Sequence, residues 1–485
     1  MNNAIIKSAI KSIILVTFFV TSSVIAQNEN DALRLATPNI FSNARALGMG
    51  NSYQTRNGDY SAIFFNPAGL ALAKKSQLTG SFYHQSNSNT SSFFDNEEIS
   101  DNNSTTFSQL GYLYKAPTTR GSLVYGFGYQ KDKDFGSALS FNGFNPNRNS
   151  MIQDLTSRND DVPYLLGLSY PIYDANDDYL NDVTIIDGNL KQSGSNFEEG
   201  GIDRYSAGAG IEVAKNVYFG GSLNYLSGSY SSNREYYEDD VLGIYNQQTD
   251  IYDANTTDFQ TFYFNDAILW NINAWEFRFG VIVDWLDFIQ FGASAKFPTT
   301  YNINEDYYLE AYSKFNDNYF IDLNPTESYV DYEITTPFEF SFGTSVNLHL
   351  INFSMQATFI DYTQMEFSGN LEKSIINENN RIITENLRAV LNYNLGAEMR
   401  IPLTGVTARA GMIYQASPYK NDPSSFDKVY LSTGAGIEVS DGIRFDFAYS
   451  YGFWDTYSDN YGSDISRVNQ SISSHTFLLS TTIMY

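Results

Sequence analysis

The sequence predicts an all-β protein, a transmembrane antiparallel β-barrel of about 14 strands. Three observations predict this fold. Segments in which apolar and polar residues alternate recur through most of the chain, short turns and long loops alternate between them, and no stretch beyond the first 26 residues is long and apolar enough for a spanning helix. Only helices and closed barrels satisfy their backbone groups in lipid, so a membrane chain without such helices is expected to be a barrel.

The first 26 residues have the pattern of a cleavable secretory signal. Lys7 and Lys11 give a positive start, residues 13–20 form a short apolar core, and cleavage is expected before Gln27. This core is shorter than the roughly 20 apolar residues of a retained membrane helix. The chain has no Cys, which excludes a lipoprotein anchor and disulfide bonds. We therefore expect an exported protein.

The composition fits a membrane barrel and excludes one class of partner. The net charge of −26 argues against nucleic acid, because nucleic acids need a basic face. Aromatic residues make up 16% of the chain, and this surplus is typical of the aromatic girdles at the two membrane interfaces. A soluble β-sandwich is also rich in Tyr and Phe, but 485 residues would need several such domains, and no Pro- or Ser-rich linker divides the chain.

The segment Ile443 to Phe453 shows the alternation most clearly. Its odd positions are Ile, Phe, Phe, Tyr, Tyr and Phe, whereas its even positions are Arg, Asp, Ala, Ser and Gly. In a barrel strand the apolar face contacts lipid and the polar face lines the lumen. Fourteen segments follow this pattern, at about 77–85, 106–117, 120–131, 202–214, 216–231, 271–285, 288–300, 334–349, 350–366, 388–402, 404–416, 429–440, 442–456 and 473–485.

The connections between these segments have the layout of a bacterial outer-membrane barrel, with short periplasmic turns and long extracellular loops. The long loops are expected at about 86–105, 132–201, 232–270, 301–333, 367–387, 417–428 and 457–472. Within the second of these loops, Tyr164 to Tyr173 is apolar enough to be a strand. Because Pro163 and Pro171 bracket it, we expect it to fold in the loop, over the barrel mouth.

Two motifs near the N-terminus resemble those of a known family. A-R-A-L-G-M-G at Ala44 to Gly50 and S-A-I-F-F-N-P-A-G-L at Ser61 to Leu70 resemble the plug, or hatch, of the FadL/TodX family of outer-membrane transporters for long-chain fatty acids and other hydrophobic compounds. A weaker resemblance recurs at Asn392 to Pro402 and Thr407 to Tyr419. The resemblance implies a barrel of 14 strands with an N-terminal plug inside the lumen. It divides the chain into a signal peptide (1–26), a plug (27–76) and a barrel with long extracellular loops (77–485).

The resemblance also implies which residues serve gating and exit. The plug and gating motif consists of Gly48, Gly50, Asn66, Pro67, Ala68 and Gly69. An Asn-Pro turn with few regular backbone bonds could shift when a solute binds, or it could be a static turn that packs the plug. In this family the solute leaves sideways beside the third strand. Gly126 and Gly128 of that strand either permit a gap or are small lumen-facing residues.

Charged residues on the polar face of the strands are candidate contacts of the plug. They are Glu276, Arg278, Glu398, Arg400, Arg409, Arg444 and Asp446. These groups could form ion pairs between wall and plug or within the wall, or one arginine could bind the carboxylate of a fatty acid.

The sequence therefore predicts an outer-membrane channel of a Gram-negative bacterium for passive uptake of long-chain fatty acids or similar hydrophobic molecules, gated by the plug, with lateral exit through the wall. Two alternatives stay open: a non-transporting barrel of the same fold that acts as a protein-secretion partner (PorV-like), and a general porin. Other expected partners are outer-membrane lipid, lipopolysaccharide and the barrel-assembly machinery, which recognises a last strand that ends in an aromatic residue such as Tyr485. The family implies a monomer.

No pattern in the sequence indicates an enzyme. His84, His349 and His475 are widely separated, Cys is absent, and neither a P-loop nor a complete dinucleotide motif occurs. We expect no catalytic residues, no metal and no cofactor.

Overall fold

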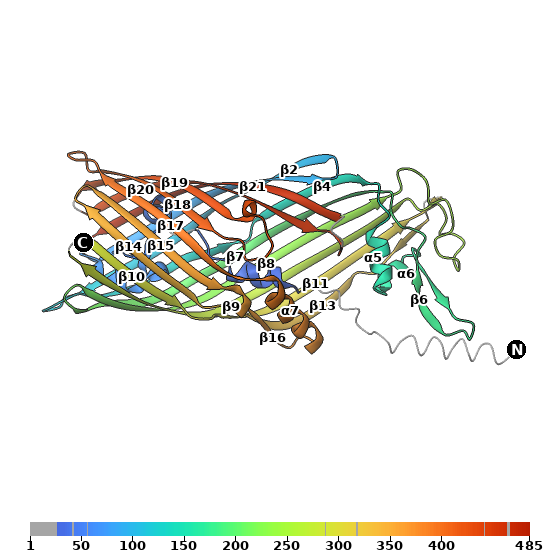
Figure 1. Cartoon of the computed structure of the whole chain (residues 1–485), viewed down its shortest axis with the longest axis horizontal. Helices are drawn as coiled ribbons and strands as arrows, with labels where there is room; N and C mark the ends of the chain where they lie inside the picture. The colour runs from blue at the N-terminus through green and yellow to red at the C-terminus, as the bar shows by residue number, and fades with distance from the viewer. Residues whose placement is uncertain are drawn as a thin grey trace.

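The computed structural model describes residues 27–40, 43–55, 57–286, 288–316, 319–440, 442–462 and 466–485. The predicted signal peptide lies outside this part of the chain. Antiparallel strands form one closed sheet around a lumen, and β1 (Gln77–Phe93) closes the sheet by pairing with β21 (Arg467–Met484) (Figure 1). The predicted transmembrane barrel of 14 strands is confirmed.

Some wall strands consist of two pieces in line that pair with the same neighbour. For example, β10 and β11 both pair with β9. Pro298 and Pro337 mark two such interruptions, because proline cannot donate to the ladder. Between β1 and β21 the wall comprises β2 (Asn96–Ala116), β3 (Leu123–Asp134) with β4 (Ser137–Asn145), β7 (Leu190–Ala214), β8 (Val217–Asp239), β9 (Thr261–Trp285), β10 (Ile289–Lys296) with β11 (Thr300–Lys314), β13 (Thr326–Thr335) with β14 (Glu339–Leu348), β15 (Ile351–Asp361) with β16 (Glu366–Gly369), β17 (Ala389–Arg400), β18 (Val406–Gln415), β19 (Lys428–Ser440) and β20 (Ile443–Asp459).

A belt of apolar side chains encircles the barrel over about half of its length. On β9 the outward positions change from Asn271 and Asn273 to an apolar run that begins at Trp275 and ends at Trp285. About ten residues of a strand tilted by about 40° span roughly 25 Å of height, which is the thickness of a membrane belt. Tyr129, Tyr205, Tyr225 and Trp275 pair from strand to strand and form an aromatic row at its upper edge. This belt places the barrel in the outer membrane, with the long connections outside the cell.

Among the described residues, no helix has the length and apolar character needed to cross a membrane.

The strands extend far beyond this belt, which corrects the predicted loops. Residues 86–105 were expected to be a loop, but they form the upper part of the β1–β2 hairpin. Large parts of 132–201, 232–270 and 301–333 likewise belong to strands. Above the membrane the outer face contacts water, so its positions need no apolar side chains. The apolar alternation that marks a strand in the sequence therefore stops at the edge of the belt.

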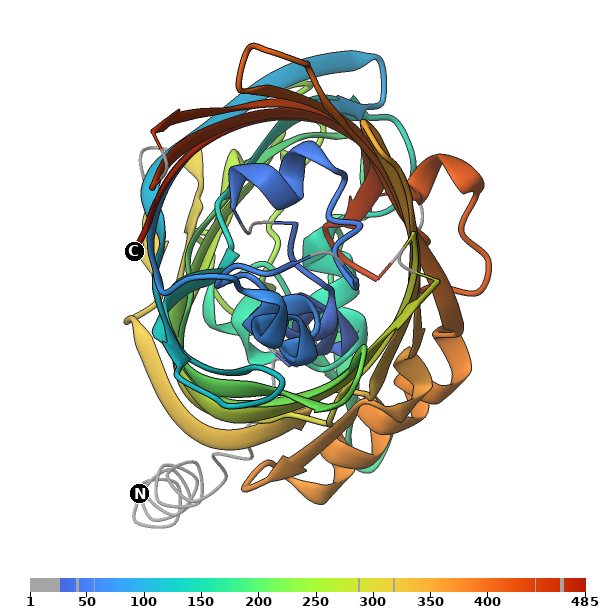
Figure 2. The ribbon, with the colours of Figure 1, turned by 90° about the vertical axis from the view of Figure 1, so that its left-hand side faces the viewer.

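The N-terminal segment folds inside the lumen, as the view along the barrel shows (Figure 2). It contains α2 (Glu29–Ala36), α3 (Ala44–Gly48), α4 (Ala62–Phe65) and η1 (Pro67–Leu72). We call residues 43–73, which lie at the height of the belt, the plug. The fold prediction of a plug inside the lumen is confirmed.

The extracellular end of the barrel is covered by a second compact unit, which we call the lid (Figure 1). It contains α5 (Met151–Ser157), α6 (Asp161–Leu165) and a hairpin of β5 (Tyr170–Tyr173) and β6 (Tyr179–Val183). The stretch Tyr164 to Tyr173 lies here, and β5 pairs with β6 rather than with the wall.

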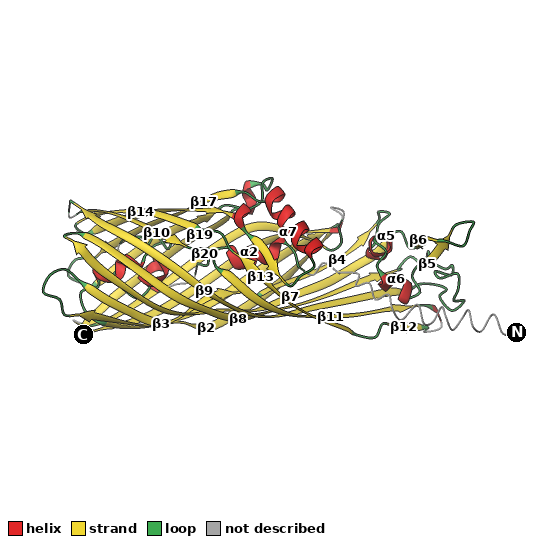
Figure 3. Ribbon diagram, turned by 90° about the horizontal axis from the view of Figure 1, so that it is seen from below, coloured by secondary structure: helices red, strands yellow, loops and turns green. Residues whose placement is uncertain are grey.

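The helix α7 (Lys373–Asn386) lies on the outer side of the wall (Figures 2 and 3). It follows β16, which pairs with β13, whereas the β15–β17 ladder ends at Asp361 and Ala389. The helix therefore covers the wall where two neighbouring strands separate, and Ile383 packs into a cluster with α2. The remaining elements are β12 (Phe320–Asp322), η3 (Tyr362–Gln364) and η4 (Ser424–Phe426).

Candidate functional site

A ring of glycines on the inner face of the wall makes room for the plug. A Cβ added to Gly220 would lie 2.2 Å from the carbonyl carbon of Pro67, and one added to Gly411 would lie 2.0 Å from the backbone nitrogen of Gly50. A side chain at either position would therefore displace the backbone of the plug. The wall glycines at which an added Cβ would lie 2.8 Å or less from a plug atom are Gly111, Gly126, Gly128, Gly210, Gly220, Gly280, Gly292, Gly343, Gly396 and Gly411. The plug thus fills the lumen at the height of the membrane.

The Asn-Pro turn of the plug is bonded to the wall. The side-chain amide of Asn66 donates to the carbonyl oxygen of Val281 at 3.1 Å and to that of Ala293 at 3.3 Å. Its carboxamide oxygen accepts the backbone N–H of Ala68 at 3.1 Å, and Pro67 opens the short helix η1. Asn66 therefore connects β9, β10 and the plug turn, and a gating movement of this turn stays a prediction.

The glycines of the predicted gating motif lie in close contacts. Gly48 faces the Cα of Gly434, which an added Cβ would approach to 3.2 Å. Gly50 has a φ of +59°, and a Cβ there would lie 2.5 Å from the backbone nitrogen of Met412. A Cβ on Gly69 would lie 1.7 Å from the side chain of Asn57, inside the plug. Two of the three glycines therefore bring the plug backbone against the wall.

A chain of ion pairs joins the plug to one side of the wall. Arg45 of α3 pairs with Glu398 at 3.3 Å, and Glu398 also binds Arg409 at 2.8 Å. Arg409 pairs with Asp446 at 2.8 Å, and Asp446 with Arg444 at 2.7 Å. Four of the charges named from the sequence thus lie together, with a plug arginine at the end of the chain.

A second charged cluster lies on the opposite strands. Arg204 pairs with Asp132 and Glu276, each at 2.5 Å, and Arg278 lies 3.7 Å from Glu276. The ring of Phe64, on the plug, lies over both guanidinium groups, at 5.2 Å from Arg204 and 5.3 Å from Arg278. Such cation–π contacts bind the plug to the wall without a plug charge.

Two members of this second cluster, Arg204 and Asp132, were not predicted from the sequence. Arg204 is at a lumen-facing position of a predicted strand, so the alternation of apolar and polar residues could have identified it. The same is true of Lys296 and Glu339, which form an ion pair. Asp132 could not be found this way, because a bulge between Lys131 and Lys133 shifts its strand by one residue. Arg400, which was predicted to be lumenal, lies exposed at the periplasmic end of β17.

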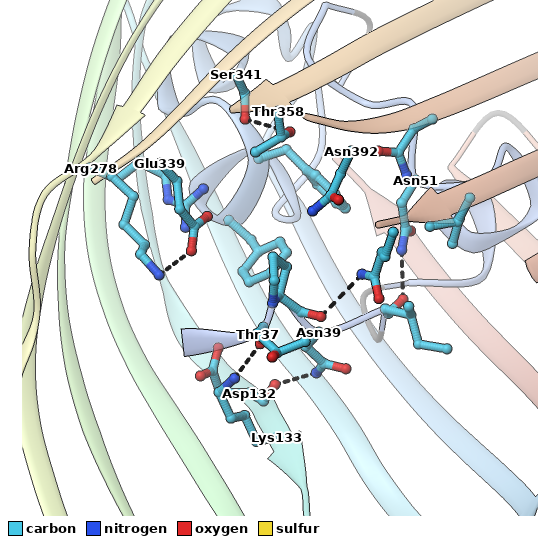
Figure 4. Close-up of a pocket in the computed structure, with 18 of the residues that line it drawn as sticks. Thr37, Asn39, Asn51, Asp132, Lys133, Arg278, Glu339, Ser341, Thr358 and Asn392 are labelled. Carbon is cyan, nitrogen blue, oxygen red and sulfur yellow. Dashed lines mark hydrogen bonds and ion pairs between the residues drawn. The ribbon is translucent and has the colours of Figure 1, made fainter. Parts of the chain in front are cut away.

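A chamber lies above the plug, around the linker that joins α2 to α3. A cavity of about 440 Å³ and a smaller one of about 80 Å³ both border Thr37 to Ile40 of this linker. Figure 4 shows the smaller cavity, in which Asp132, Lys133 and Glu339 surround Thr37 and Asn39.

The larger cavity combines aromatic surfaces with cationic groups. Phe135, Tyr362, Phe426, Tyr430 and Trp454 contribute the rings. The ammonium of Lys428 lies 4.9 Å from the ring centre of Trp454, and among the described residues no carboxylate pairs with it. Such a lining suits a solute with an apolar body and an anionic end.

The wall splits beside this chamber. The ladder between β2 and β3 runs from Ala116 and Leu123 to Gln109 and Gln130, and it ends there. Directly beyond, each strand carries a bulge, at Ser108 on β2 and at Asp132 on β3. Bulges bend strands and interrupt pairing, so the two strands diverge from this point toward the extracellular side.

Asp134, on β3, bridges the split to the strands on its other side. Its carboxylate accepts a hydrogen bond from Tyr83 of β1 and one from Ser104 of β2, the latter at 3.0 Å. Asp134 and Gly136 line the chamber on the inside and also a polar groove of about 590 Å³ on the outside. At this place only the side chain of Asp134 and the turn at Gly136 therefore separate the chamber from the exterior.

Gly126 and Gly128, which were predicted to mark the exit, lie below the split. Both are paired with β2 on one side and with β7 on the other. A Cβ on Gly126 would meet Ile63, and a Cβ on Gly128 would meet Tyr60. These two glycines make room for the plug, whereas the interruption of their strand begins at Lys131.

The lid closes the extracellular mouth with apolar side chains. Leu166 and Leu168 are fully buried in a cluster that also contains Ile152 of α5 and Phe262 of β9. Glu238 on β8 accepts the backbone N–H of Met151 at 2.7 Å. Burial raises the pKa of Glu238 to about 7, because the charged carboxylate is costly without solvent.

Among the residues described, no group of three or more His, Cys, Asp or Glu side chains is arranged to hold a metal ion.

No family model and no curated protein matches this sequence. Solved structures do match. A FadL homologue of Pseudomonas aeruginosa aligns with a TM-score of 0.57 at 13% identity, covering 93% of this chain and 99% of that one. The toluene transporter TodX of Pseudomonas putida aligns with a TM-score of 0.55 at 13% identity, covering 92% and 98%.

The chain has the fold of these outer-membrane transporters. A third solved structure, the toluene transporter TbuX of Ralstonia pickettii, aligns with a TM-score of 0.51 at 13% identity over 92% of this chain and 98% of that one. Each alignment covers nearly all of both chains.

Proposed function

We propose that this protein is an outer-membrane channel for the passive uptake of hydrophobic molecules, and that its solutes are fatty acid-like amphiphiles. The observation that carries the proposal is the combination of a filled lumen and a split wall. The glycine ring leaves no room beside the plug, while the chamber and the outer groove share Asp134 and Gly136. The split begins directly above the aromatic row at the upper edge of the belt, so a solute in the chamber can leave sideways at the outer edge of the lipid, whereas the plug blocks the way below.

The chamber supports a solute with a carboxylate. An apolar chain can lie on the aromatic rings, and Lys428 is available to an anionic end. A pure hydrocarbon would leave the ammonium of Lys428 without an anionic partner in a partly desolvated site. A general porin is disfavoured, because the plug fills the lumen at membrane height.

A disulfide across the split tests the route. The chain has no Cys, so Ser104→Cys with Asp134→Cys introduces a single pair at a place where the two native side chains are 3.0 Å apart. Tyr112→Cys with Phe127→Cys is the matched control, because these residues pair across the same two strands below the split. We expect oxidation of the first pair to stop uptake of labelled oleate by cells, and reduction to restore it. Equal uptake by the oxidised and reduced forms of the first pair would contradict lateral exit.

The solute class is tested separately with Lys428→Met, which keeps the volume and removes the charge. Uptake of labelled oleate should fall about tenfold, whereas uptake of toluene should not change, because only the acid loses an ionic partner. Equal losses for the two solutes would contradict the assignment of a carboxylate to this site.

A further inference from the structure

The split leaves one edge of β2 without a neighbouring strand. β2 pairs with β1 from Asn96 to Leu113, but with β3 only from Gln109 to Ala116. Residues 96–108, all of them described, therefore have one edge whose alternate N–H and C=O groups have no ladder partner. This edge lies above the aromatic row, where Leu110 pairs with Tyr129, and so on the extracellular side (Figure 1).

The layer beneath β2 does not occupy this edge. β4 passes under the β1–β2 hairpin and receives side-chain hydrogen bonds from it, such as that from Asn96 to the carbonyl oxygen of Asn142 at 2.9 Å. Ile99 points away from β4 and is 70% exposed. Residues 96–108 also contain neither the proline nor the lysine with which natural edge strands commonly prevent pairing.

A groove runs beside the open edge. It has a volume of about 590 Å³, and its lining comes from β2 on one side and from β7 and β8 on the other. Residues 102–104 and Thr106 form the β2 side, and Gly200 and Gly201 the opposite side.

The charges around the groove identify the kind of chain that fits. Glu97, Glu98 and Asp101 lie on the free part of β2, and Glu199, Asp203 and Asp134 lie across the groove, where Lys131 is the single cation among the lining residues. The negative charge on both sides of the groove disfavours a second copy of this acidic surface. It attracts a basic chain.

We propose that the open edge of β2 binds an extended, basic segment of another protein at the cell surface by adding it to the sheet as a strand. Backbone hydrogen bonds to residues 96–108 provide affinity, and the acidic side chains select lysine and arginine. This interaction goes beyond solute uptake, and a bound strand would also cover the outer side of the split and so hinder lateral exit.

A labelled peptide with the repeat Lys-Val-Lys-Thr, twelve residues long, tests the proposal on the full-length protein in detergent micelles. Fluorescence anisotropy measures binding, and hydrogen exchange reports which amides become protected. Three probes are compared: this peptide, the same peptide with alternate backbone nitrogens methylated, and a version with glutamate in place of lysine. The methylated peptide keeps the charge but cannot donate to the edge.

We expect the basic peptide to bind and to protect amides of residues 96–108, and the other two peptides not to bind. The variant Glu97→Lys with Glu98→Lys and Asp101→Lys should weaken binding about tenfold or more. The control variant Asp174→Lys with Asp177→Lys and Asp178→Lys changes as many acids in the exposed β5–β6 connection and should bind normally.

Three outcomes would overturn the proposal. Equal binding of the methylated peptide would show that charge alone attracts it. Protection elsewhere, without protection of residues 96–108, would place the site on another surface. A dimer in solution that protects these amides without any peptide would assign the edge to a second copy.

Discussion

The plug and the lid close the same lumen with different kinds of contact. The plug touches the wall through apolar side chains, as the lid does, but also through backbone atoms at glycines, hydrogen bonds of Asn66 and ion pairs of Arg45. The lid is held mainly by buried apolar side chains such as Leu166. An apolar solute can replace contacts of the second kind but not of the first. We therefore expect the lid to yield to a solute more readily than the plug.

The largest expected effect comes from a side chain in the glycine ring. In Gly220→Leu the added atoms would overlap the backbone of Pro67, so the plug is displaced rather than compressed, at a cost of about 3 kcal/mol or more. We expect conductance in planar bilayers to rise at least tenfold and residues 43–73 to become sensitive to protease. Ala293→Leu, which adds bulk on the lipid side of the neighbouring wall, is the control. A closed, protease-resistant Gly220→Leu barrel would show that the plug does not fill the lumen.

The lid should respond to a loss of apolar contact. Leu166 is fully buried, and truncation to alanine costs about 2–5 kcal/mol in a packed core. The neighbouring Leu165 is 51% exposed, so Leu165→Ala is a matched control at the next residue. We expect Leu166→Ala to speed hydrogen exchange of residues 151–168 and to speed entry of labelled oleate into the chamber, with unchanged exchange in the plug. If both variants exchange alike, the lid is not held by this cluster.

These two seals also show what a single sequence can and cannot predict. The belt strands were found because lipid on one face and a polar lumen on the other enforce alternation, as on β9 from Trp275 to Trp285. Above the belt the outer face contacts water rather than lipid, so alternation is not required and the sequence predicts a loop at residues 86–105. The lid cluster joins Ile152 to Phe262, and contacts over such separations leave no local pattern.

The split in the wall was out of reach for a related reason. Bulges at Ser108 and Asp132 each add one residue, which reverses the inside and outside positions beyond them. A prediction based on strict alternation therefore ends the strand at the bulge, which is where the split begins. It could name Gly126 and Gly128, because glycine is visible in the sequence, but not Asp134, whose partners come from β1 and β2.

The ion pairs of the plug should contribute less than its close packing. Arg45→Met removes the plug end of the chain, while Glu398 keeps Arg409 as a partner, so the expected loss is about 2 kcal/mol. We expect the plug to become accessible to protease at lower urea concentration than in the native protein, with no change in the heat stability of the barrel on gels. Arg400→Met, at an exposed position of β17, is the control. Equal urea sensitivity of the two variants would mean that Arg45 does not hold the plug.

The smallest expected effect is a pH dependence confined to the lid. Glu238 has a pKa raised to about 7 when buried under α5, whereas an exposed glutamate titrates near its ordinary value of 4.5. The closed lid therefore binds more protons than the open one between these values, and closure weakens as the pH rises through 7. Between pH 6 and pH 8 the loss is about 1 kcal/mol. Above pH 8 both states are ionised and the effect levels off.

Glu238→Gln isolates this contribution, because glutamine keeps an acceptor for the N–H of Met151 but does not titrate. Hydrogen exchange of residues 151–157, corrected for the intrinsic pH dependence of exchange, should be faster at pH 8 than at pH 6 in the native protein and equal at both in the variant. Asn66 of the plug and the wall carbonyl groups that it binds do not titrate, so hydrogen exchange around Asn66 should not depend on pH in either protein. A pH response shared by lid and plug would contradict the idea that the two seals open independently.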